Sequence, residues 1–177
     1  SRKTVWDSSG SDTLNLTAMD DPVTVYLTYR YSDADLGMEY GHVIQNPGES
    51  FQKWHHLLGE FESVYTGSGN DTIFGDENAN VLSAGSGDDF IAGYEADDIL
   101  FGGTGADFFM LAEGHGNDII KDFELGIDTC GFWDGTGYDP SLATLNSTEN
   151  GNAIYMLSDG SSLLLEGVLY SDVSVVA

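Results

Sequence analysis

Residues 66–110 divide without remainder into five segments of nine residues, and this period constrains the fold more than any other feature of the chain. The segments read TGSGNDTIF, GDENANVLS, AGSGDDFIA, GYEADDILF and GGTGADFFM. Their sixth positions are acids or an amide, namely Asp71, Asn80, Asp89, Asp98 and Asp107. Their eighth positions are apolar, namely Ile73, Leu82, Ile91, Leu100 and Phe109. Such a repeat predicts one small structural unit per period, each stacked on its neighbours.

Each segment joins a turn to a short strand. The first six residues are mostly Gly, Asp, Asn and Ser, which favour turns because Gly accepts positive φ and Asx side chains bond nearby amides. The last three residues centre on the apolar position and form a strand too short to be stable alone. Stacking at about 4.8 Å pairs these strands and buries the eighth side chain between two sheets. Alternate segments are therefore expected to share a sheet.

The pattern resembles the G-G-x-G-x-D-x-U-x repeat of RTX (hemolysin-type) calcium-binding proteins. The resemblance implies an all-β chain, a right-handed parallel β-roll capped by flanking antiparallel strands. It also implies calcium between the loops of alternate repeats. One loop would supply the carbonyls of positions two and four with the sixth carboxylate, and the other loop would supply positions one, three and six. Oxygen donors on Gly-rich loops suit Ca²⁺, and we expect about three to five ions.

Carried over residue by residue, the loops that begin at 66, 84 and 102 form one row with two sites. The first site takes Gly67, Gly69 and Asp71 with Ala84, Ser86 and Asp89. The second takes Gly85, Gly87 and Asp89 with Gly102, Thr104 and Asp107.

The loops that begin at 75, 93 and 113 form the other row. Its first site takes Asp76, Asn78 and Asn80 with Gly93, Glu95 and Asp98. Affinity should be lower here, because Asn80 replaces a carboxylate and Ala96 replaces a glycine. Two extra residues after Met110 shift the frame, so residues 113–118 (EGHGND) are expected to lie over residues 93–98 (GYEADD). A second site then takes Tyr94, Ala96 and Asp98 with Glu113, His115 and Asp118. Residues 57–65 are interpreted as a degenerate repeat that extends the row through Glu60 and Glu62.

The flanking segments resemble parts of serralysin-type secreted metalloproteases. VWDSSGSDTLNL at 5–16 resembles the segment before their repeats, and its Asp7, Ser9, Gly10 and Asp12 fall on a calcium half-site of that family. NDIIKDFELGID at 117–128 resembles the segment that ends RTX arrays, where Asp122 and Asp128 either bind metal or cap a turn. The tail SDVSVVA resembles the ending of type I secretion substrates.

Other patterns predict local structure outside the repeats. Residues 23–31 alternate strictly and predict a strand, whereas 51–61 predict a short helix or loop with His55 and His56 beside it as polar residues. NAIYML and SLLLEGVL around SDGS predict a hairpin. The flanking strands are expected to cover four rings of the roll, those of Phe74, Phe90, Phe101 and Phe108. We expect one domain, with an N-terminal cap at 1–56, the roll and its terminating segment at 57–128, and capping strands with a candidate secretion signal at 129–177.

Composition limits the partners of the chain. Thirty acidic against five basic residues give a formal charge of −25, which disfavours nucleic acid and anionic membranes. The chain has no run of 18 apolar residues that would span a membrane, and its 41% hydrophobic content is too high for a disordered chain. No Lys or Arg lies between Lys53 and Lys121, so the repeats need metal to offset their repulsion. Cys130 is alone and is interpreted as a small apolar residue.

HExxH, GxSxG and GxxxxGK motifs are absent, so we expect no enzyme activity in this chain. The predicted function is that of a calcium-binding RTX module of a larger secreted, extracellular protein, which folds on calcium after type I export. Its partners would be calcium, the type I secretion apparatus and an upstream catalytic or adhesive domain. Two alternatives remain open, a module that binds a polysaccharide or cell-surface ligand and a self-contained enzyme acting on a polymer.

Overall fold

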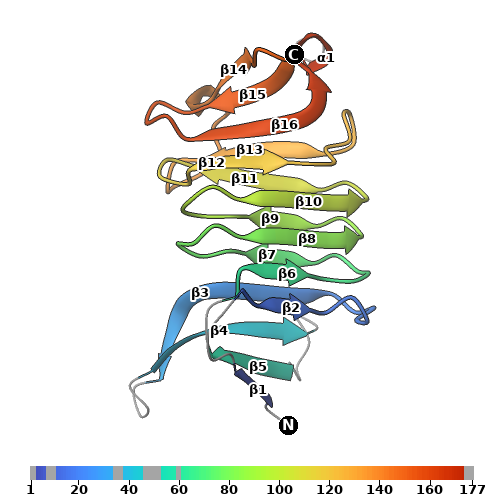
Figure 1. Cartoon of the computed structure of the whole chain (residues 1–177), viewed down its shortest axis with the longest axis vertical. Helices are drawn as coiled ribbons and strands as arrows, with labels where there is room; N and C mark the ends of the chain where they lie inside the picture. The colour runs from blue at the N-terminus through green and yellow to red at the C-terminus, as the bar shows by residue number, and fades with distance from the viewer. Residues whose placement is uncertain (1–2, 7–10, 34–37, 46–52, 59–60, 174–177) are drawn as a thin grey trace.

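The computed structural model describes residues 3–6, 11–33, 38–45, 53–58 and 61–173, and these form two eight-stranded sheets (Figure 1). The first sheet has the order β1 (Lys3–Trp6), β5 (Lys53–Leu58), β4 (Met38–Gln45), β3 (Val23–Asp33), β7 (Thr72–Phe74), β9 (Phe90–Ala92), β11 (Phe108–Ala112) and β13 (Thr129–Trp133). The second has the order β14 (Thr144–Ser147), β15 (Asn152–Met156), β16 (Ser162–Leu169), β12 (Asn117–Ile120), β10 (Ile99–Thr104), β8 (Val81–Ser86), β6 (Ser63–Tyr65) and β2 (Thr13–Asn15). A 3₁₀ helix, η1 (Pro140–Leu142), and a short helix, α1 (Tyr170–Val173), complete the described elements.

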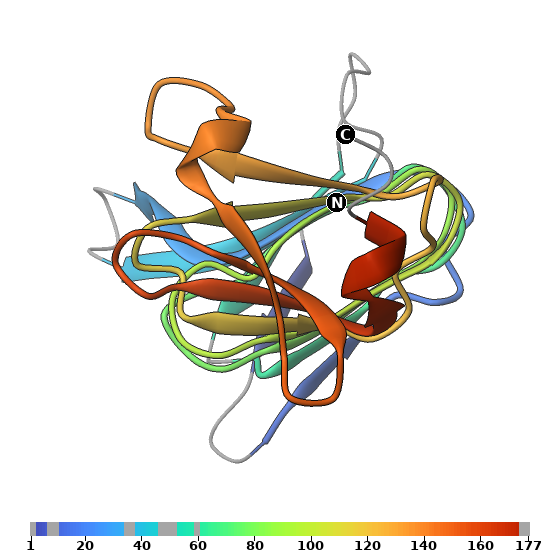
Figure 2. The ribbon, with the colours of Figure 1, turned by 90° about the horizontal axis from the view of Figure 1, so that it is seen from above.

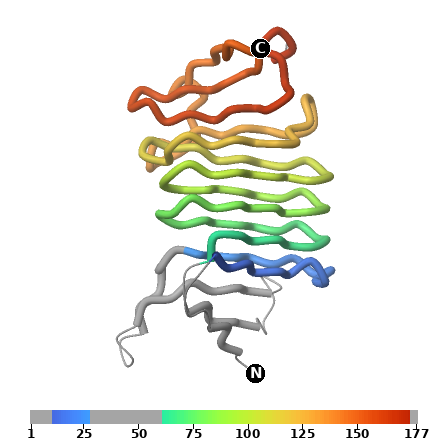
Figure 3. Tube along the Cα trace, in the orientation of Figure 1, coloured from blue at the N-terminus to red at the C-terminus, as the bar shows by residue number. Residues whose placement is uncertain are grey.

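The repeats wind as successive coils, and each coil gives one strand to each sheet (Figure 3). Seen along the long axis, the two sheets form two layers joined by loops at both sides (Figure 2). Strands β6, β8, β10 and β12 pair in parallel in one sheet, and β7, β9, β11 and β13 do so in the other. Leu82 pairs with Leu100, and Ile73 with Ile91. The expected parallel roll, with alternate repeats in one sheet, is confirmed.

The core lies between the two layers and is built from the eighth repeat position. Each side chain at that position is 0% exposed, namely Ile73, Leu82, Ile91, Leu100 and Phe109. Val64 below and Ile120 above extend the column and are also fully buried. Burial of such a side chain stabilises the fold by about 1.5–3 kcal/mol, so the stacked column is the main apolar contribution of the repeats.

The N-terminal segments extend the first sheet. Strand β3 pairs in parallel with β7, and its Val23, Val25 and Leu27 are buried, which confirms the strand expected at 23–31. The short helix or loop expected at 51–61 is wrong for residues 53–58, which form β5. Strands β1 and β4 lie on either side of β5 and pair with its backbone. Such tertiary pairing overrides a local spacing of apolar residues.

The C-terminal strands extend the second sheet. Strands β15 and β16 form the antiparallel hairpin expected around SDGS, β14 pairs with β15, and β16 continues the sheet in parallel with β12. Flanking strands therefore lengthen the sheets instead of covering the aromatic positions, and that expectation is wrong. Phe101 is half-buried on β10, in the second sheet.

On the first sheet, aromatic rings of neighbouring strands contact one another, two pairs stacked, one tilted and one edge-to-face. We call Tyr26, Phe74, Phe90, Phe108 and Tyr138 the aromatic ladder. Successive ring centroids along it lie 4.9, 5.5, 5.5 and 5.1 Å apart. These spacings lie in the range of favourable aromatic pairs. The ladder therefore links β3, β7, β9 and β11 on the outer face, and its last ring, Tyr138, comes from the segment between β13 and η1.

Among the residues that the structure describes, no helix has the length and apolar character needed to cross a bilayer.

Candidate metal centre

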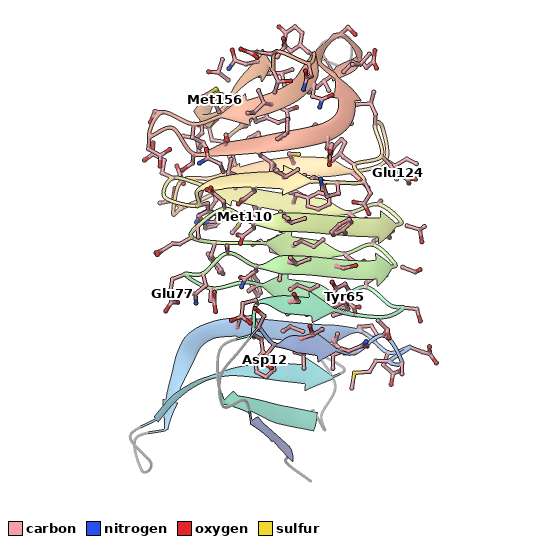
Figure 4. All side chains as sticks on the ribbon, viewed as in Figure 1. Asp12, Tyr65, Glu77, Met110, Glu124 and Met156 are labelled. Carbon is pink, nitrogen blue, oxygen red and sulfur yellow. The ribbon has the colours of Figure 1, made fainter. Side chains whose placement is uncertain are left out.

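The repeat loops form two rows at opposite edges of the roll. Row one contains loops 66–71, 84–89 and 102–107, and row two contains loops 75–80, 93–98 and 113–118. In Figure 4, Glu77 marks row two on one side, while Glu124 lies on the other side, beside the end of row one. Successive repeats place their strands in alternate sheets, so successive loops lie at opposite edges of the roll.

In row one, the sixth-position carboxylates reach from loop to loop. The backbone N–H of Asp71 donates to Oδ1 of Asp89 (2.7 Å), and that of Asp89 donates to Oδ1 of Asp107 (3.0 Å). All three residues are only 2% exposed. The structure thus brings the predicted carboxylates of this row into one continuous stack.

The second oxygen of each of these carboxyl groups has no partner. Oδ2 is buried without a hydrogen bond in Asp71, Asp89, Asp98, Asp107 and Asp118. A buried carboxylate oxygen without a donor or cation is strongly destabilising. Among the described residues, the ion pair found joins Lys121 to Glu166 and lies outside both rows. The orphaned oxygens are therefore the observation that calls for a bound cation.

The electrostatics show the same need. Burial, with a smaller effect of neighbouring carboxylates, raises the pKa of Asp118 to about 8 and the pKa of Asp89 and Asp98 to about 7. Burial raises the pKa of Asp107 to about 6. Without a cation, Asp118 would be mostly protonated at neutral pH and Asp89 and Asp98 about half protonated, whereas a divalent ion would keep them ionised.

Backbone carbonyls of row one face the next loop. The carbonyl of Gly67 accepts from the N–H of Ser86 (3.0 Å) and lies where a Cβ at Gly85 would be. The carbonyl of Gly69 stands in the same relation to Gly87. Gly85 and Gly87 also have φ values of 104° and 131°. A Cβ at Gly85 or Gly87 would therefore collide with a carbonyl oxygen of the loop below, and positive φ favours glycine at both positions. The resulting set of carbonyl and carboxylate oxygens suits Ca²⁺.

Row two repeats this arrangement over its upper two loops. The N–H of Asp98 donates to Oδ1 of Asp118 (3.0 Å), which confirms that 113–118 lie over 93–98. Tyr94 and Ala96 both have a φ of 72°, so they hold the left-handed positions of their loop without being glycine. His115 is buried against Tyr94, with ring centroids 5.4 Å apart. The exposed Glu113 accepts a hydrogen bond from Ser158.

The lowest loop of row two differs because its own side chains close it. Oδ1 of Asp76 accepts from the N–H of Asn78 (2.8 Å) and from the side-chain amide of Asn80 (3.3 Å). Oδ1 of Asn80 accepts in turn from the N–H of Asp76 (3.0 Å). Asp76 and Asn78 do not have positive φ. Although the N–H of Asn80 donates to Oδ1 of Asp98 (2.8 Å), this loop lacks the left-handed positions seen above it. Glu95 across from it is exposed.

Row two continues below the repeats. Glu62 lies one level below Asn80, since β6 pairs with β8, and its Oε2 accepts from the N–H of Asp12 (2.7 Å). Asp12 therefore occupies the next level of the same column, near the lower end of the roll in Figure 4. The predicted ligands Asp7 and Glu60, with Ser9 and Gly10, lie outside the described residues.

Row one ends at two carboxylates, Asp122 and Asp128, that accept backbone hydrogen bonds. Oδ1 of Asp128 accepts from the N–H of Asp107 (3.0 Å), and its Oδ2 accepts from the N–H of Glu124 (2.7 Å). The two oxygens of Asp122 accept from the N–H groups of Gly102 and Gly103, each at 3.0 Å. Both acids thus have backbone donors on both oxygens. Asp128 caps the turn that begins at Glu124, and Asp122 bonds the backbone of β10. Metal binding by either acid stays a prediction.

Sequence reasoning missed a second ladder at the fifth repeat position. Oδ1 of Asn70 accepts from the N–H of Asp88 (3.1 Å), and Oδ1 of Asp88 accepts from the N–H of Ala106 (2.9 Å). In row two, Asp97 accepts in the same way from Asn117 (2.8 Å). The sequence feature that could have predicted this ladder is the pair of residues at positions five and six, namely Asn70-Asp71, Asp88-Asp89 and Asp97-Asp98. Through these hydrogen bonds, the exposed side chains at the fifth position link neighbouring loops.

Replacing Ala96 by glycine should stabilise the calcium-loaded protein by about 0.5–1 kcal/mol, because glycine relieves the left-handed strain at this position. Ala106→Gly is the matched control. Ala106 has no positive φ, so there the added chain entropy of glycine should destabilise by about 0.4–1 kcal/mol. Urea unfolding in saturating calcium measures both changes. Equal signs for the two variants would contradict the assignment of strain to Ala96.

Acidification should promote folding of the metal-free protein. The folded-state pKa values of about 6 to 8 exceed the ordinary value of 3.8, so protonation stabilises the fold at low pH and is lost as pH rises through that range. The β signal in circular dichroism of calcium-depleted protein should increase between pH 8 and pH 5. High salt at pH 8 is the control, since it screens general repulsion without protonating buried groups. If salt reproduced the whole increase, the buried carboxylates would not be its cause.

Within the described part of the chain, no three His, Cys, Asp or Glu side chains gather into a metal-binding group. Sites that combine backbone carbonyls with two carboxylates need no such group. Comparison with known protein families matches the RTX calcium-binding nonapeptide repeat, in four copies, over residues 61–91, 74–109 and 92–121. Comparison with curated proteins finds no match for the chain.

Proposed function

Because residues 61–121 are RTX calcium-binding nonapeptide repeats, we propose that this calcium-binding module is the folding switch of a larger secreted protein. In this proposal the module stays unfolded inside the cell, where calcium is scarce, leaves through a type I exporter and folds outside. The chain itself has no catalytic role, and an upstream domain supplies any catalytic or adhesive activity.

The supporting observation is the double row of buried, unpartnered carboxylate oxygens. Calcium, when bound, would supply positive charge and oxygen coordination at these rows. Asp89 and Asp107 in row one, and Asp98 and Asp118 in row two, would hold it together with loop carbonyls. Extracellular calcium modules bind with Kd of about 10⁻⁴–10⁻³ M, so such sites would fill outside the cell and stay empty inside. Coupling of metal binding to folding then makes export and folding mutually exclusive.

The polysaccharide-binding alternative receives less support from the outer face of the roll. Glycan sites need accessible ring faces, whereas Phe90 and Phe108 stack on each other at an interplanar angle of 13°. Their faces are therefore occupied within the aromatic ladder. Scarcity of Lys and Arg further disfavours a polyanionic glycan.

The test is secretion of a carrier protein fused ahead of the chain, in cells with a type I exporter. The full-length fusion should appear in the medium, and a variant lacking residues 171–177 should stay in the cell although the purified variant still folds with calcium. Deletion of Glu149 and Asn150, two exposed residues of the turn between β14 and β15, is the control for general damage. Secretion of the truncated carrier at the full-length level would remove the export role of the tail.

A further inference from the structure

A cavity of about 370 Å³ lies at the last strands of the first sheet, where β11 and β13 end. Trp133 is the last residue of β13, the edge strand of this sheet, and it pairs in register with Ala112 at the end of β11. Such a volume is typical of a site for one small ligand or one side chain. The described residues that line it are Ala112, Glu113, Trp133, Asp134, Gly135 and Leu142.

The ring of Trp133 forms a fixed aromatic wall of this cavity. Its backbone forms an antiparallel bridge with Tyr138, and the two ring centroids lie 5.0 Å apart at an interplanar angle of 69°. Tyr138 also contacts Phe108 edge-on, with centroids 5.1 Å apart. Trp133 is half-buried, so part of its surface stays accessible. The aromatic ladder therefore holds the indole in place before any ligand binds.

The carboxylate of Asp134 is held by its own turn. Its Oδ1 accepts from the hydroxyl of Thr136 (2.7 Å), from the N–H of Thr136 (2.7 Å) and from the N–H of Gly137 (2.8 Å). These bonds, that of the Thr136 hydroxyl foremost, lower the pKa of Asp134 below its ordinary value. All three reach Oδ1, and Oδ2 accepts no hydrogen bond from the described residues. Asp134 thus offers a fixed negative charge with one oxygen left for a ligand.

Glu113 brings a second carboxylate to the same cavity, from the turn that follows β11. Its Oε1 accepts from the hydroxyl of Ser158, and Oε2 accepts no hydrogen bond from the described residues. None of the described lining residues is basic, and Lys121 pairs with Glu166 instead. The cavity therefore combines an indole with two acids that have no counter-charge.

We propose that this cavity binds an organic cation, the alkylammonium or guanidinium group that Lys and Arg side chains and free amines share. The indole attracts such a cation through its π face, and the cation donates hydrogen bonds to the free oxygens of Asp134 and Glu113. Ca²⁺ suits the cavity less, because an indole offers it no oxygen. A neutral sugar would contact the indole without offsetting the two charges. The inference is independent of the calcium sites in the two rows.

The test follows the indole N–H signal of Trp133 by NMR in the ¹⁵N-labelled full chain with saturating calcium, and Trp133→Phe assigns the signal. The probes are the N-acetyl methyl amides of lysine and of arginine. The lysine probe acetylated at Nε is their neutral counterpart. The signal should shift saturably with both cationic probes and stay in place with the neutral one. No saturable shift, or an equal shift with the neutral probe, would overturn the site.

Charge-removing variants separate this site from general attraction to an acidic protein. Asp134→Asn keeps the oxygen that holds the turn, and both it and Glu113→Gln should weaken binding of the cationic probes at least about threefold. Asp139→Asn is the matched control. Asp139 lies on the same segment, but it is outside the cavity lining and its Oδ1 accepts from Ser141 (2.8 Å), so affinity should be nearly unchanged. Equal weakening by Asp134→Asn and Asp139→Asn would overturn the proposal.

A peptide of Gly and Ser with one central Arg distinguishes the two sources of the cation. Tighter binding of this peptide than of the arginine probe would assign the cavity to a basic segment of a protein partner, because the flanking backbone then adds contacts. Equal binding would assign it to free amines and guanidines.

Discussion

Removing calcium should unfold the roll, and returning it should restore the fold. Each ion that binds only the folded state stabilises it by about 2.7 kcal/mol when calcium is about 100-fold above Kd. Two or more such ions match the whole stability of a typical domain, about 5–15 kcal/mol. Without them, five buried Asp side chains keep unpartnered oxygens in a chain of formal charge −25. Circular dichroism in EDTA should therefore lose most of its β signal, and millimolar calcium should recover it.

Magnesium is the control for this experiment. It needs a tighter octahedral geometry and loses water reluctantly, so an equal concentration should leave the chain largely unfolded. Sodium chloride at the same ionic strength controls for screening. Identical spectra in EDTA and in calcium would contradict metal-driven folding and leave the repeats as a purely apolar solenoid.

Asp89→Asn should have opposite effects with and without calcium. Asp89 is assigned to both sites of row one, so the variant removes one carboxylate from each and should raise the calcium midpoint of folding at least tenfold, by the scale of lost metal contacts (about 10–100-fold). Burial raises the pKa of Asp89 to about 7, so in EDTA at pH 8 the neutral amide should stabilise the residual fold. Its Oδ1 can still accept from Asp71.

Asp88→Asn is the neighbouring control. Asp88 is exposed, and its Oδ1 accepts from Ala106, a bond that the amide oxygen keeps. We expect the calcium midpoint to stay within about twofold, since exposed substitutions usually change stability by less than about 0.5 kcal/mol. Calcium titrations followed by circular dichroism measure both variants. Similar midpoints for Asp88→Asn and Asp89→Asn would show that the sixth position has no special place in metal binding.

The repeated part of the molecule could be predicted from sequence because its signal is local. A nine-residue period placed Leu82 under Leu100, identified the buried column and brought Asp89 under Asp107, and the structure confirms each of these. Family comparison confirms the RTX repeats themselves. The metal ligands assigned to these positions stay predictions.

What sequence reasoning missed depends on contacts between distant segments. Residues 53–58 form a strand because β1 and β4 lie on both sides of them, and the spacing of apolar residues carries no trace of those partners. Likewise, AMDDPV at 18–23 does not resemble a repeat, and only the pairing of Val25 with Ile73 places it below loop 66–71. Loop 75–80 is closed by hydrogen bonds between Asp76 and the side-chain amide of Asn80. The repeat pattern shows that Asn80 occupies the sixth position, but it does not show that its amide bonds within its own loop.

The aromatic ladder also determines the register in which the coils pair. A slip of two repeats would return every core side chain and most loop bonds to equivalent partners, so the periodic contacts alone cannot tell one coil from the next. Between β7 and β9 the ladder changes column, because Phe74 lies opposite Ala92 while Phe90 lies opposite Thr72. A slipped chain would break this diagonal and separate the rings. The ladder thus fixes which coil pairs with which, and it does so through ring contacts on the outer face of the first sheet, away from the rows of loops.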